Sequence, residues 1–411
     1  MRLDSPVRWI AGLVLLLAVF ALARPQSLTL ADSESTFTVN SLAAPAGANS
    51  SEPQLTIQGD RIILSWLEVT GERATLKFAE RTASGWSAPQ SVFSGSNFFV
   101  NAYDVPSVHA LADGTLAAHW IEKNGADSDS DASKVRLSWS KDQGHTWSRP
   151  VSPHHDGTQT EHGFVSTFQA PGAGLGLVWI DGRATDPEKE TGDMSLRASV
   201  YDAEGKQLRE TVVVPRVCEC CSTGAAETSE GEIVAFRGRS ASEVRNIYVS
   251  RFAAGRWSAP AVVHDDGWRI DACPINGPAV SANGWEVAVA WFVAKNDQGR
   301  AFVAFSHDAG RTFAPPIRVD DASSLGRLGV QMLGDGSAAV TWIEFANQHS
   351  QFRVRRVSPS GVRSGAVTVA DTSGGRYPRV ARYKNELLFS WTDGEGSTSR
   401  VRTARAGIDG K

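Results

Sequence analysis

The chain has 411 residues and a formal net charge of −4, from 41 Lys and Arg against 45 Asp and Glu. This slightly acidic balance excludes the basic footprint of a nucleic-acid-binding protein. Only four residues are cysteines. Beyond the first 23 residues no apolar run is long enough to span a bilayer, so we expect a mature chain without a membrane segment.

The first residues have the form of a secretory signal peptide. Two arginines precede an apolar run of about 15 residues, which is shorter than the ~20 residues that span a bilayer. The run ends in Ala21-Leu22-Ala23, the small-x-small form of a signal-peptidase site, with an uncleaved anchor as the alternative. We predict a signal peptide over residues 1–23, a linker over 24–34, and a periplasmic or secreted protein.

The remainder of the chain repeats one pattern seven times. Each repeat contains an apolar, β-rich segment about one strand long, with an aromatic anchor near its end. The anchors, 49 to 59 residues apart, are Trp66, Trp120, Trp179, Phe236, Trp291, Trp342 and Trp391. Hairpin patterns precede and follow the anchored segments, which gives four strands per repeat without an amphipathic helix. This arrangement predicts one all-β domain over residues 35–407, a seven-bladed β-propeller.

Two alternatives to seven blades are a six-bladed ring, if one repeat is an insertion, and a linear array of β-sandwiches. The seventh repeat ends early, at 399–407, without a fourth strand. Near the N-terminus, residues 35–45 (STFTVNSLAAP) have the pattern of a displaced strand. We therefore predict that an N-terminal strand completes the last blade and removes the open edge of the ring.

Two turns resemble a known repeat motif. Residues 140–147 (SKDQGHTW) fit S-x-D-x-G-x-T-W, and residues 306–313 (SHDAGRTF) fit it with Phe in place of Trp. The pattern resembles the Asp-box, or BNR repeat, of bacterial sialidases (neuraminidases). The resemblance implies an Asp-box propeller in which Asp142 and Asp308 are structural and lie on the face opposite the active site. It also implies an exo-sialidase-like glycoside hydrolase that acts on a glycan or glycoconjugate.

The resemblance implies three arginines that hold the substrate carboxylate, a Tyr–Glu nucleophile pair and an Asp acid/base. The sequence departs from this pattern. The segment most similar to the family's Arg-Ile-Pro motif is Tyr103-Asp104-Val105-Pro106, which has Asp104 in place of the arginine. A carboxylate at that position repels an acidic sugar instead of binding it. The candidate catalytic residues are Asp104, Arg183, Arg237, Arg239 and Asp271, and the candidate substrate-binding residues are Tyr103, Trp268 and Arg327. Loop packing is the alternative role for Tyr103 and Trp268, and loop capping for Asp271.

Three of the four cysteines fall in one short segment, and propeller geometry explains how the fourth joins them. Cys218, Cys220 and Cys221 precede the fourth repeat, and Cys273 precedes the fifth. Both segments enter inner strands of adjacent blades, so we expect all four sulfurs to converge near the channel. Three interpretations stay open, namely a disulfide between blades with a second, short-loop bridge, a redox-active dithiol, and a thiolate site for copper or zinc.

Histidines from a neighbouring loop are candidate ligands for the same metal. They are His154, His155 and His162, and a solvated polar loop is the alternative for that segment. The leading functional hypothesis is a monomeric, exported propeller for glycan recognition or hydrolysis. A copper- or zinc-binding or redox-linked propeller built on the cysteines is the second, and a protein-interaction platform is the third.

Overall fold

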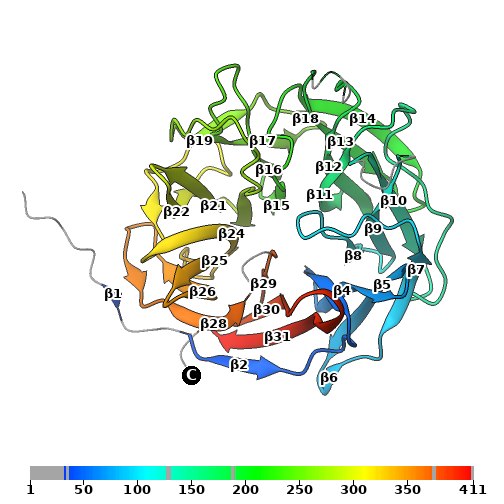
Figure 1. The fold of residues 1–411 in the computed structure, drawn as a ribbon, viewed down its shortest axis with the longest axis horizontal. Coiled ribbons are helices and arrows are strands. Elements are labelled where there is room, and N and C mark those ends of the chain that lie inside the picture. Colours follow the sequence, from blue (N-terminus) through cyan, green and yellow to red (C-terminus); the bar gives the residue numbers. More distant parts are fainter. Residues whose placement is uncertain are drawn as a thin grey trace, which may run out of the picture.

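The chain forms a ring of seven antiparallel β-sheets around a central channel (Figure 1). The structure is a computed structural model that describes residues 32–33, 37–125, 131–186, 189, 191–372 and 376–408. The predicted signal peptide, and the predicted linker apart from residues 32–33, lie outside these ranges. No helix in the described ranges is long and apolar enough to cross a membrane. The seven-bladed, all-β prediction is confirmed, and the six-bladed alternative is wrong.

Blades 1 to 4 follow one another along the chain. Blade 1 contains β3 (Ser50–Gln58), β4 (Arg61–Thr70), β5 (Arg73–Thr82), β6 (Gly85–Trp86) and β7 (Gln90–Gly95), and blade 2 contains β8 (Ser107–Ala110), β9 (Leu116–Lys123) and β10 (Ser133–Ser140). Blade 3 contains β11 (His162–Ala170), β12 (Gly174–Asp181), β13 (Ser195–Tyr201) and β14 (Gln207–Val214). Blade 4 contains β15 (Gly224–Thr228), β16 (Gly231–Arg237), β17 (Ile247–Ala253), β18 (Arg256–Trp257) and β19 (Ala261–His264).

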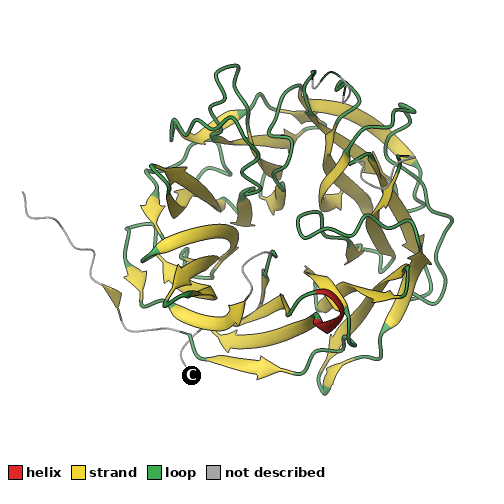
Figure 2. Cartoon of the chain, in the orientation of Figure 1, coloured by secondary structure: helices red, strands yellow, loops and turns green. Residues whose placement is uncertain are grey.

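Blades 5 to 7 complete the ring. Blade 5 contains β20 (Ala279–Asn283), β21 (Glu286–Lys295), β22 (Gln298–Ser306) and β23 (Ile317–Arg318). Blade 6 contains β24 (Ser323–Met332), β25 (Ala338–Ala346), β26 (His349–Val357), β27 (Arg363–Ser364) and β28 (Val367–Thr372), with β1 (Asp32–Ser33) parallel to β27. Blade 7 contains β29 (Arg379–Tyr383), β30 (Glu386–Asp393), β31 (Arg400–Gly407) and β2 (Val39–Leu42). The described helical structure is one 3₁₀ turn, Gly396–Thr398 (Figure 2).

The aromatic anchors lie on the second strand of each blade and form the core between blades. Because this strand is flanked by two strands of its own blade and covered on both faces by neighbouring blades, it is apolar throughout rather than alternating. Trp66, Trp120 and Trp179 are fully buried. Each donates its indole N–H to a carboxylate two residues later, at 2.8–3.1 Å. This contact explains why the sequence motif Trp-x-Glu/Asp recurs, since a buried indole N–H needs an acceptor.

The ring closes with a strand from the other end of the chain. β2 pairs antiparallel with β31, with Val39 opposite Ala406 and Leu42 opposite Thr403. The Thr403 hydroxyl donates to the Leu42 carbonyl at 2.8 Å. The predicted N-terminal closing strand is confirmed, and it covers the edge that β31 would otherwise expose.

The two Ser-x-Asp-x-Gly-x-Thr turns share one hydrogen-bond pattern. In the first, Asp142 accepts from the Ser140 hydroxyl at 2.8 Å, from the Thr146 N–H at 2.9 Å and from the Thr146 hydroxyl at 2.6 Å. Asp308 accepts from the equivalent groups of the second turn. The hydrogen bonds from Thr146, foremost among several contacts, lower the pKa of Asp142 to about 2. Both carboxylates are therefore occupied in shaping their own turns.

Candidate functional site at the channel mouth

A cavity of about 520 Å³ lies at the centre of the ring. Residues of all seven inner strands line it, from β3, β8, β11, β15, β20, β24 and β29 (Figure 1). It continues to the residues that directly precede these strands, such as Tyr103, Thr223 and Tyr377. We call the channel end where the inner strands begin the channel mouth. Because the connecting loops of successive blades meet there, it can combine side chains that are far apart in the sequence.

An arginine lies between two tyrosines at the mouth. The Arg327 guanidinium carbon is 5.2 Å from the ring centroid of Tyr103 and 4.7 Å from that of Tyr377. The two rings are 6.4 Å apart and nearly perpendicular. Both Arg327 and the Tyr377 hydroxyl donate to the carbonyl of Ile275. The structure thus brings the two predicted substrate-binding residues Tyr103 and Arg327 together, with a third aromatic group.

A bulge in β24 directs Arg327 toward this position. The pairing register shifts between Gly326 and Gly329, and Arg327 adopts a left-handed backbone conformation with φ of 57°. Its N–H donates to the Asn276 side chain at 3.0 Å. A non-glycine residue at positive φ is strained, and such strain persists where the surrounding structure holds the residue for another purpose.

Arg379 is a second guanidinium at the mouth. It is the first residue of β29, lines the cavity, and lies 5.7 Å from the centroid of the Tyr377 ring. Burial lowers its pKa to about 10, while the nearby Tyr377 and Asp104 favour the charged form, so it is cationic at neutral pH. Its buried Nε has no hydrogen-bond acceptor among the described residues. A charged donor without an acceptor suits an anionic ligand.

Asp104 lies beside these groups, 5% exposed, and also lines the cavity. Its Oδ2 accepts the Phe164 N–H at 2.7 Å, at a bulge in β11 where Phe164 has φ of 56°. Burial raises the pKa of Asp104 to about 7, although hydrogen bonds from Phe164 and Val165 and the charge of Arg379 oppose that rise. Asp104 therefore supports blade 3, and the repulsion that we expected toward an acidic sugar is reduced when this carboxyl is protonated.

Deeper in the channel the wall is polar and neutral. The Ser107 hydroxyl is 2.6 Å from His109 Nε2 and 2.9 Å from His119 Nδ1, and the Thr167 hydroxyl is 2.6 Å from His109 Nε2. Burial lowers the pKa of His109 to about 4 and that of His119 to about 3. Sequence reasoning missed these residues, together with Tyr377 and Arg379. The available signal was a histidine inside otherwise apolar strands, directly before Trp120 in one case.

Five of the other candidate residues do not line the cavity, namely Arg183, Arg237, Arg239, Trp268 and Asp271. Arg237, at the end of the second strand of blade 4, is 1% exposed and donates to the carbonyls of Asn276, Arg245 and Phe292 at 2.7–2.9 Å. Its guanidinium carbon lies 4.9 Å from the ring centroid of Trp268, which is 5% exposed. This pair ties blade 4 to blade 5, so packing replaces the catalytic and substrate-binding roles that we expected for these two residues.

Arg239 and Asp271 do not line the cavity either. Arg239 forms ion pairs with Glu243 at 2.9 Å and with Glu219 at 3.5 Å. Asp271 is exposed on the connector before blade 5. We expected both side chains at the channel mouth, but Arg239 forms ion pairs within the loops and Asp271 is a surface carboxylate.

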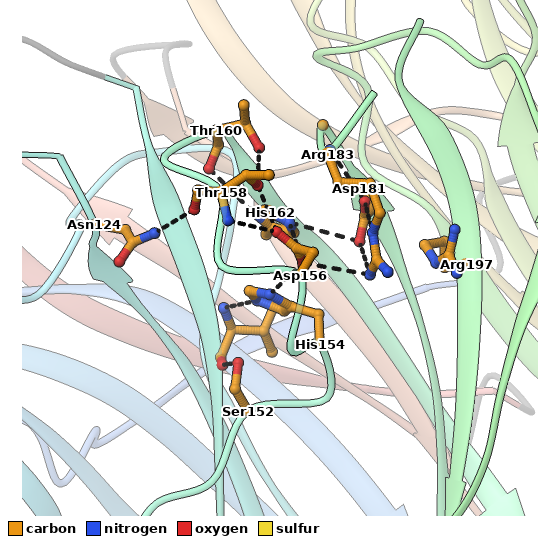
Figure 3. A network of polar contacts seen from close by, with 12 residues as sticks. Asn124, Ser152, His154, Asp156, Thr158, Thr160, His162, Asp181, Arg183 and Arg197 are labelled. Atoms are coloured by element: carbon orange, nitrogen blue, oxygen red, sulfur yellow. Dashed lines mark hydrogen bonds and ion pairs between the residues drawn. The ribbon is translucent and has the colours of Figure 1, made fainter. Parts of the chain in front are cut away.

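The histidine loop forms a second polar cluster, between blades 2 and 3 (Figure 3). His154 and His162 stack with ring centroids 3.9 Å apart, and each has a ring nitrogen 3.2 Å from Asp156 Oδ2. His162 Nε2 is also 3.6 Å from Asp181, which accepts two 2.7 Å hydrogen bonds from Arg183. Arg183 thus belongs to this cluster and not to the mouth.

The chemistry of this cluster favours ion pairing over metal binding. His154, Asp156 and His162 place three ligand atoms within 4.8 Å of one another. However, the Arg183 guanidinium lies 3.5 Å from Asp156 and also pairs with Asp181. A divalent cation would be repelled by this positive charge and would compete with it for both carboxylates. His154 Nε2 already accepts the Val135 N–H. His155 is exposed. The predicted histidine contribution to a metal site at the cysteines is replaced by this separate network.

The structure brings all four cysteines together. Cys220 and Cys273 form a disulfide that joins the connectors before blades 4 and 5. Cys218 and Cys221 are free and buried, with sulfurs 2.7 Å apart, and the Cys218 sulfur is 4.0 Å from that of Cys220. A disulfide sulfur carries no thiolate charge, so the four-cysteine metal site, one of the three open interpretations, is not available in this form.

The two free thiols differ. Burial raises the pKa of the Cys218 thiol, but the hydrogen bond with Cys221 and the charges of Arg237 and Arg245 outweigh this effect and lower it to about 7. For Cys221, burial and the contact with Cys218 both raise the pKa well above its usual range. The pair therefore combines one thiol that ionises readily with a neighbouring thiol that stays protonated.

Comparisons with known proteins agree with the fold. No protein-family model and no curated protein matches the sequence. Similar solved structures include the polysaccharide lyase Uly1, at 12% identity and TM-score 0.52, covering 86% of this chain and 89% of that one. The match to phage phi92 endosialidase, at 10% identity and TM-score 0.51, covers 91% of this chain and 69% of that one. The match to the GH93 α-L-arabinofuranosidase of Fusarium graminearum, at 10% identity and TM-score 0.50, covers 89% of this chain and 99% of that one. At such identities the likeness shows a shared β-propeller fold.

Proposed function

We propose that this propeller recognises an acidic glycan, an oligosaccharide that carries carboxylate groups, at the channel mouth. The observation that carries the proposal is the cationic Arg379, which lines the cavity with a buried Nε that lacks an acceptor among the described residues. A guanidinium binds a carboxylate through charge-assisted hydrogen bonds, and burial strengthens this interaction.

The other groups at the mouth suit the rest of a sugar. Tyr103, which is half-buried, offers an aromatic ring for packing against a pyranose ring, and the buried Tyr377 supports it from behind. The hydroxyls of Ser107 and Thr167 and the neutral imidazoles of His109 and His119 offer donors and acceptors for sugar hydroxyls. A cavity of about 520 Å³ is within the usual size range of small-molecule sites.

Two further observations support a sialidase-like propeller. The paired Ser-x-Asp-x-Gly-x-Thr turns share one hydrogen-bond pattern, as expected for Asp-box repeats. Three solved structures of similar fold are named for a polysaccharide lyase, an endosialidase and an arabinofuranosidase. We place recognition before hydrolysis, because Asp104 stands where the family places an arginine and already holds the β11 bulge.

Calorimetry with the mature chain tests this proposal. We expect binding of a sialyl-oligosaccharide or an oligouronide, and at least tenfold weaker binding of a neutral oligosaccharide of equal length. Arg379→Gln should reduce binding of the acidic ligand at least tenfold. Arg382→Gln is the matched control, since Arg382 lies on the same strand and lines the same cavity but donates to the carbonyls of Lys384 and Met332. Equal affinity for acidic and neutral ligands would sink the proposal.

A fluorogenic sialoside panel separates hydrolysis from recognition. Turnover that Arg379→Gln abolishes would add catalysis to the same site, whereas binding without turnover would leave a recognition module. We also propose that the chain is exported, because residues 1–23 have the form of a signal peptide. N-terminal sequencing of the protein from the periplasm or medium should then begin at Arg24, and light scattering should give the mass of a monomer.

A further inference from the structure

The four cysteines differ in access to solvent as well as in bonding. Cys273 is exposed and Cys220 is half-buried, whereas Cys218 and Cys221 are 0% and 1% exposed. An external molecule can therefore reach the disulfide but not the free thiols. Of the disulfide, the sulfur of Cys220 lies 4.0 Å from the free Cys218 sulfur.

We infer that these cysteines form a thiol–disulfide relay, in which the buried Cys218–Cys221 dithiol reduces an external disulfide through the exposed Cys220–Cys273 pair. The inference is independent of the proposed glycan site. It rests on the order of the sulfurs from the interior to the surface, which is Cys221, Cys218, Cys220 and Cys273. Exchange between neighbouring sulfurs needs a thiolate beside a disulfide, and this arrangement supplies both.

The internal exchange takes two steps, and each step breaks one S–S bond and forms another. First, the Cys218 thiolate attacks the Cys220 sulfur, and the Cys220–Cys273 bond breaks to release the Cys273 thiolate. Next, the Cys221 thiol gives up its proton and attacks Cys218, which releases Cys220 as a thiol. The buried pair is then a disulfide and the exposed pair is a dithiol, with no net change in electrons.

The external step uses a disulfide as the co-reactant. The exposed Cys273 thiolate attacks one sulfur of that disulfide and releases the other sulfur as a thiolate. Cys220 then attacks the mixed disulfide, releases the second thiol and restores the Cys220–Cys273 bridge. Overall, Cys218 and Cys221 lose two electrons, the proton of Cys221 leaves with the second external sulfur, and the external disulfide becomes one thiol and one thiolate.

The surroundings favour a reactive Cys218. Arg237 and Arg245 are each 1% exposed. Arg245 pairs with Glu219 at 3.0 Å and with Glu243 at 2.9 Å, whereas the hydrogen bonds of Arg237 go to neutral carbonyls and no described carboxylate forms an ion pair with it. Positive charge beside a buried sulfur stabilises the thiolate. Gly277 keeps the two connectors close, since a Cβ there would collide with the backbone oxygen of Ser222.

The test uses the full chain with Ellman's reagent, an aromatic disulfide, under native conditions. We expect release of two aromatic thiols per chain, and peptide mapping should then find a Cys218–Cys221 bridge beside an intact Cys220–Cys273 bridge. The urea-unfolded starting protein should alkylate at two cysteines. Native protein that releases no aromatic thiol, although its two thiols react after unfolding, would overturn the relay.

Two single variants separate the relay from simple exposure of thiols. Cys221→Ser keeps the attacking Cys218 but removes the resolving thiol, so native iodoacetamide should trap the freed Cys273. Cys218→Ser is the matched control, which also keeps the disulfide, and we expect at least tenfold less label on Cys273. Equal labelling in both variants would contradict the relay. Stoichiometric copper or zinc in protein purified without chelator, with no native exchange, would assign the cysteines to a metal instead.

Discussion

The Oδ2 atom of Asp104 accepts the backbone N–H of Phe164 at 2.7 Å, although the two residues are 60 positions apart. One belongs to the connector before blade 2, and the other to the bulge in β11 of blade 3. The same relationship recurs where Asn276, before blade 5, accepts the N–H of Arg327 in the β24 bulge of blade 6. Side chains of one connector thus shape the inner strand of the following blade, and with it the channel mouth.

Asp104→Asn should change how stability depends on pH. The folded-state pKa of Asp104 is about 7, above its unfolded value near ~4, so the folded state holds this proton more tightly. The resulting stability is present below about pH 4 and is lost as the pH rises through about 7. Asparagine does not ionise, so the stability of Asp104→Asn relative to wild type should rise by roughly 2.5 kcal/mol between pH 5 and pH 8.

Urea unfolding at the two pH values measures this difference. Asp104→Ala is the control for the hydrogen bond itself. It leaves the Phe164 N–H without its acceptor and should lower stability by about 1–3 kcal/mol at pH 5. If the difference between Asp104→Asn and wild type is the same at both pH values, the carboxyl does not titrate in this range.

Arg183→Met should destabilise the histidine cluster strongly. Asp181 is fully buried and accepts hydrogen bonds from both Arg183 and the Trp179 indole. Removing the guanidinium leaves a buried carboxylate without its cation, which costs about 3–5 kcal/mol. The loss should show in urea unfolding at pH 7.

Arg197→Met tests whether the loss comes from Asp181. Arg197 pairs with Glu210, which is partly exposed, and does not contact Asp181. Replacing it should cost about 1 kcal/mol or less. Similar losses in both variants would show that Asp181 does not depend on Arg183.

The architecture could be predicted from the sequence because one pattern, an apolar strand with an aromatic anchor, repeats seven times. The second strand of each blade must be apolar throughout. In several blades the indole N–H of the tryptophan donates to a carboxylate two residues later, as with Trp66 and Glu68. Such a pattern survives divergence between blades. The closing strand could be predicted for a related reason, since β31 would otherwise expose its edge.

The site could be predicted only in part, because it depends on the direction in which each side chain points more than on the position of the residue in the sequence. Arg237 and Arg327 look alike in the sequence, yet Arg237 turns into the space between blades and Arg327 is aimed at the mouth by a bulge. Arg379 is the first residue of an inner strand, and the sequence pattern there predicts a hairpin but no functional side chain. The sequence predicts that His162 lies near the cysteines, because both belong to connectors, but in the structure His162 contacts Asp181 between blades 2 and 3.

Phe37→Ala should weaken the closure of the ring. Phe37 is 4% exposed and packs with Phe389 and Ala406 of blade 7, directly before β2. Truncating a buried Phe costs about 3–5 kcal/mol, and the loss here should free β2 and expose the edge of β31. Hydrogen exchange should then accelerate in β31. Asn40→Ala, at an exposed position of β2, should leave exchange unchanged. Equal exchange in both variants would mean that closure does not depend on this contact.

Tyr103→Ala should weaken glycan binding more than it weakens the fold. Tyr103 borders the cavity, and its ring contacts Arg327 and Tyr377. Losing this aromatic surface should reduce binding of an acidic oligosaccharide about tenfold, equivalent to about 1.4 kcal/mol. Tyr103→Phe keeps the ring and should bind within twofold of wild type. Calorimetry and urea unfolding on the same samples distinguish the two roles of the ring. A Tyr103→Ala variant that is less stable but binds normally would show that Tyr103 only packs the loops.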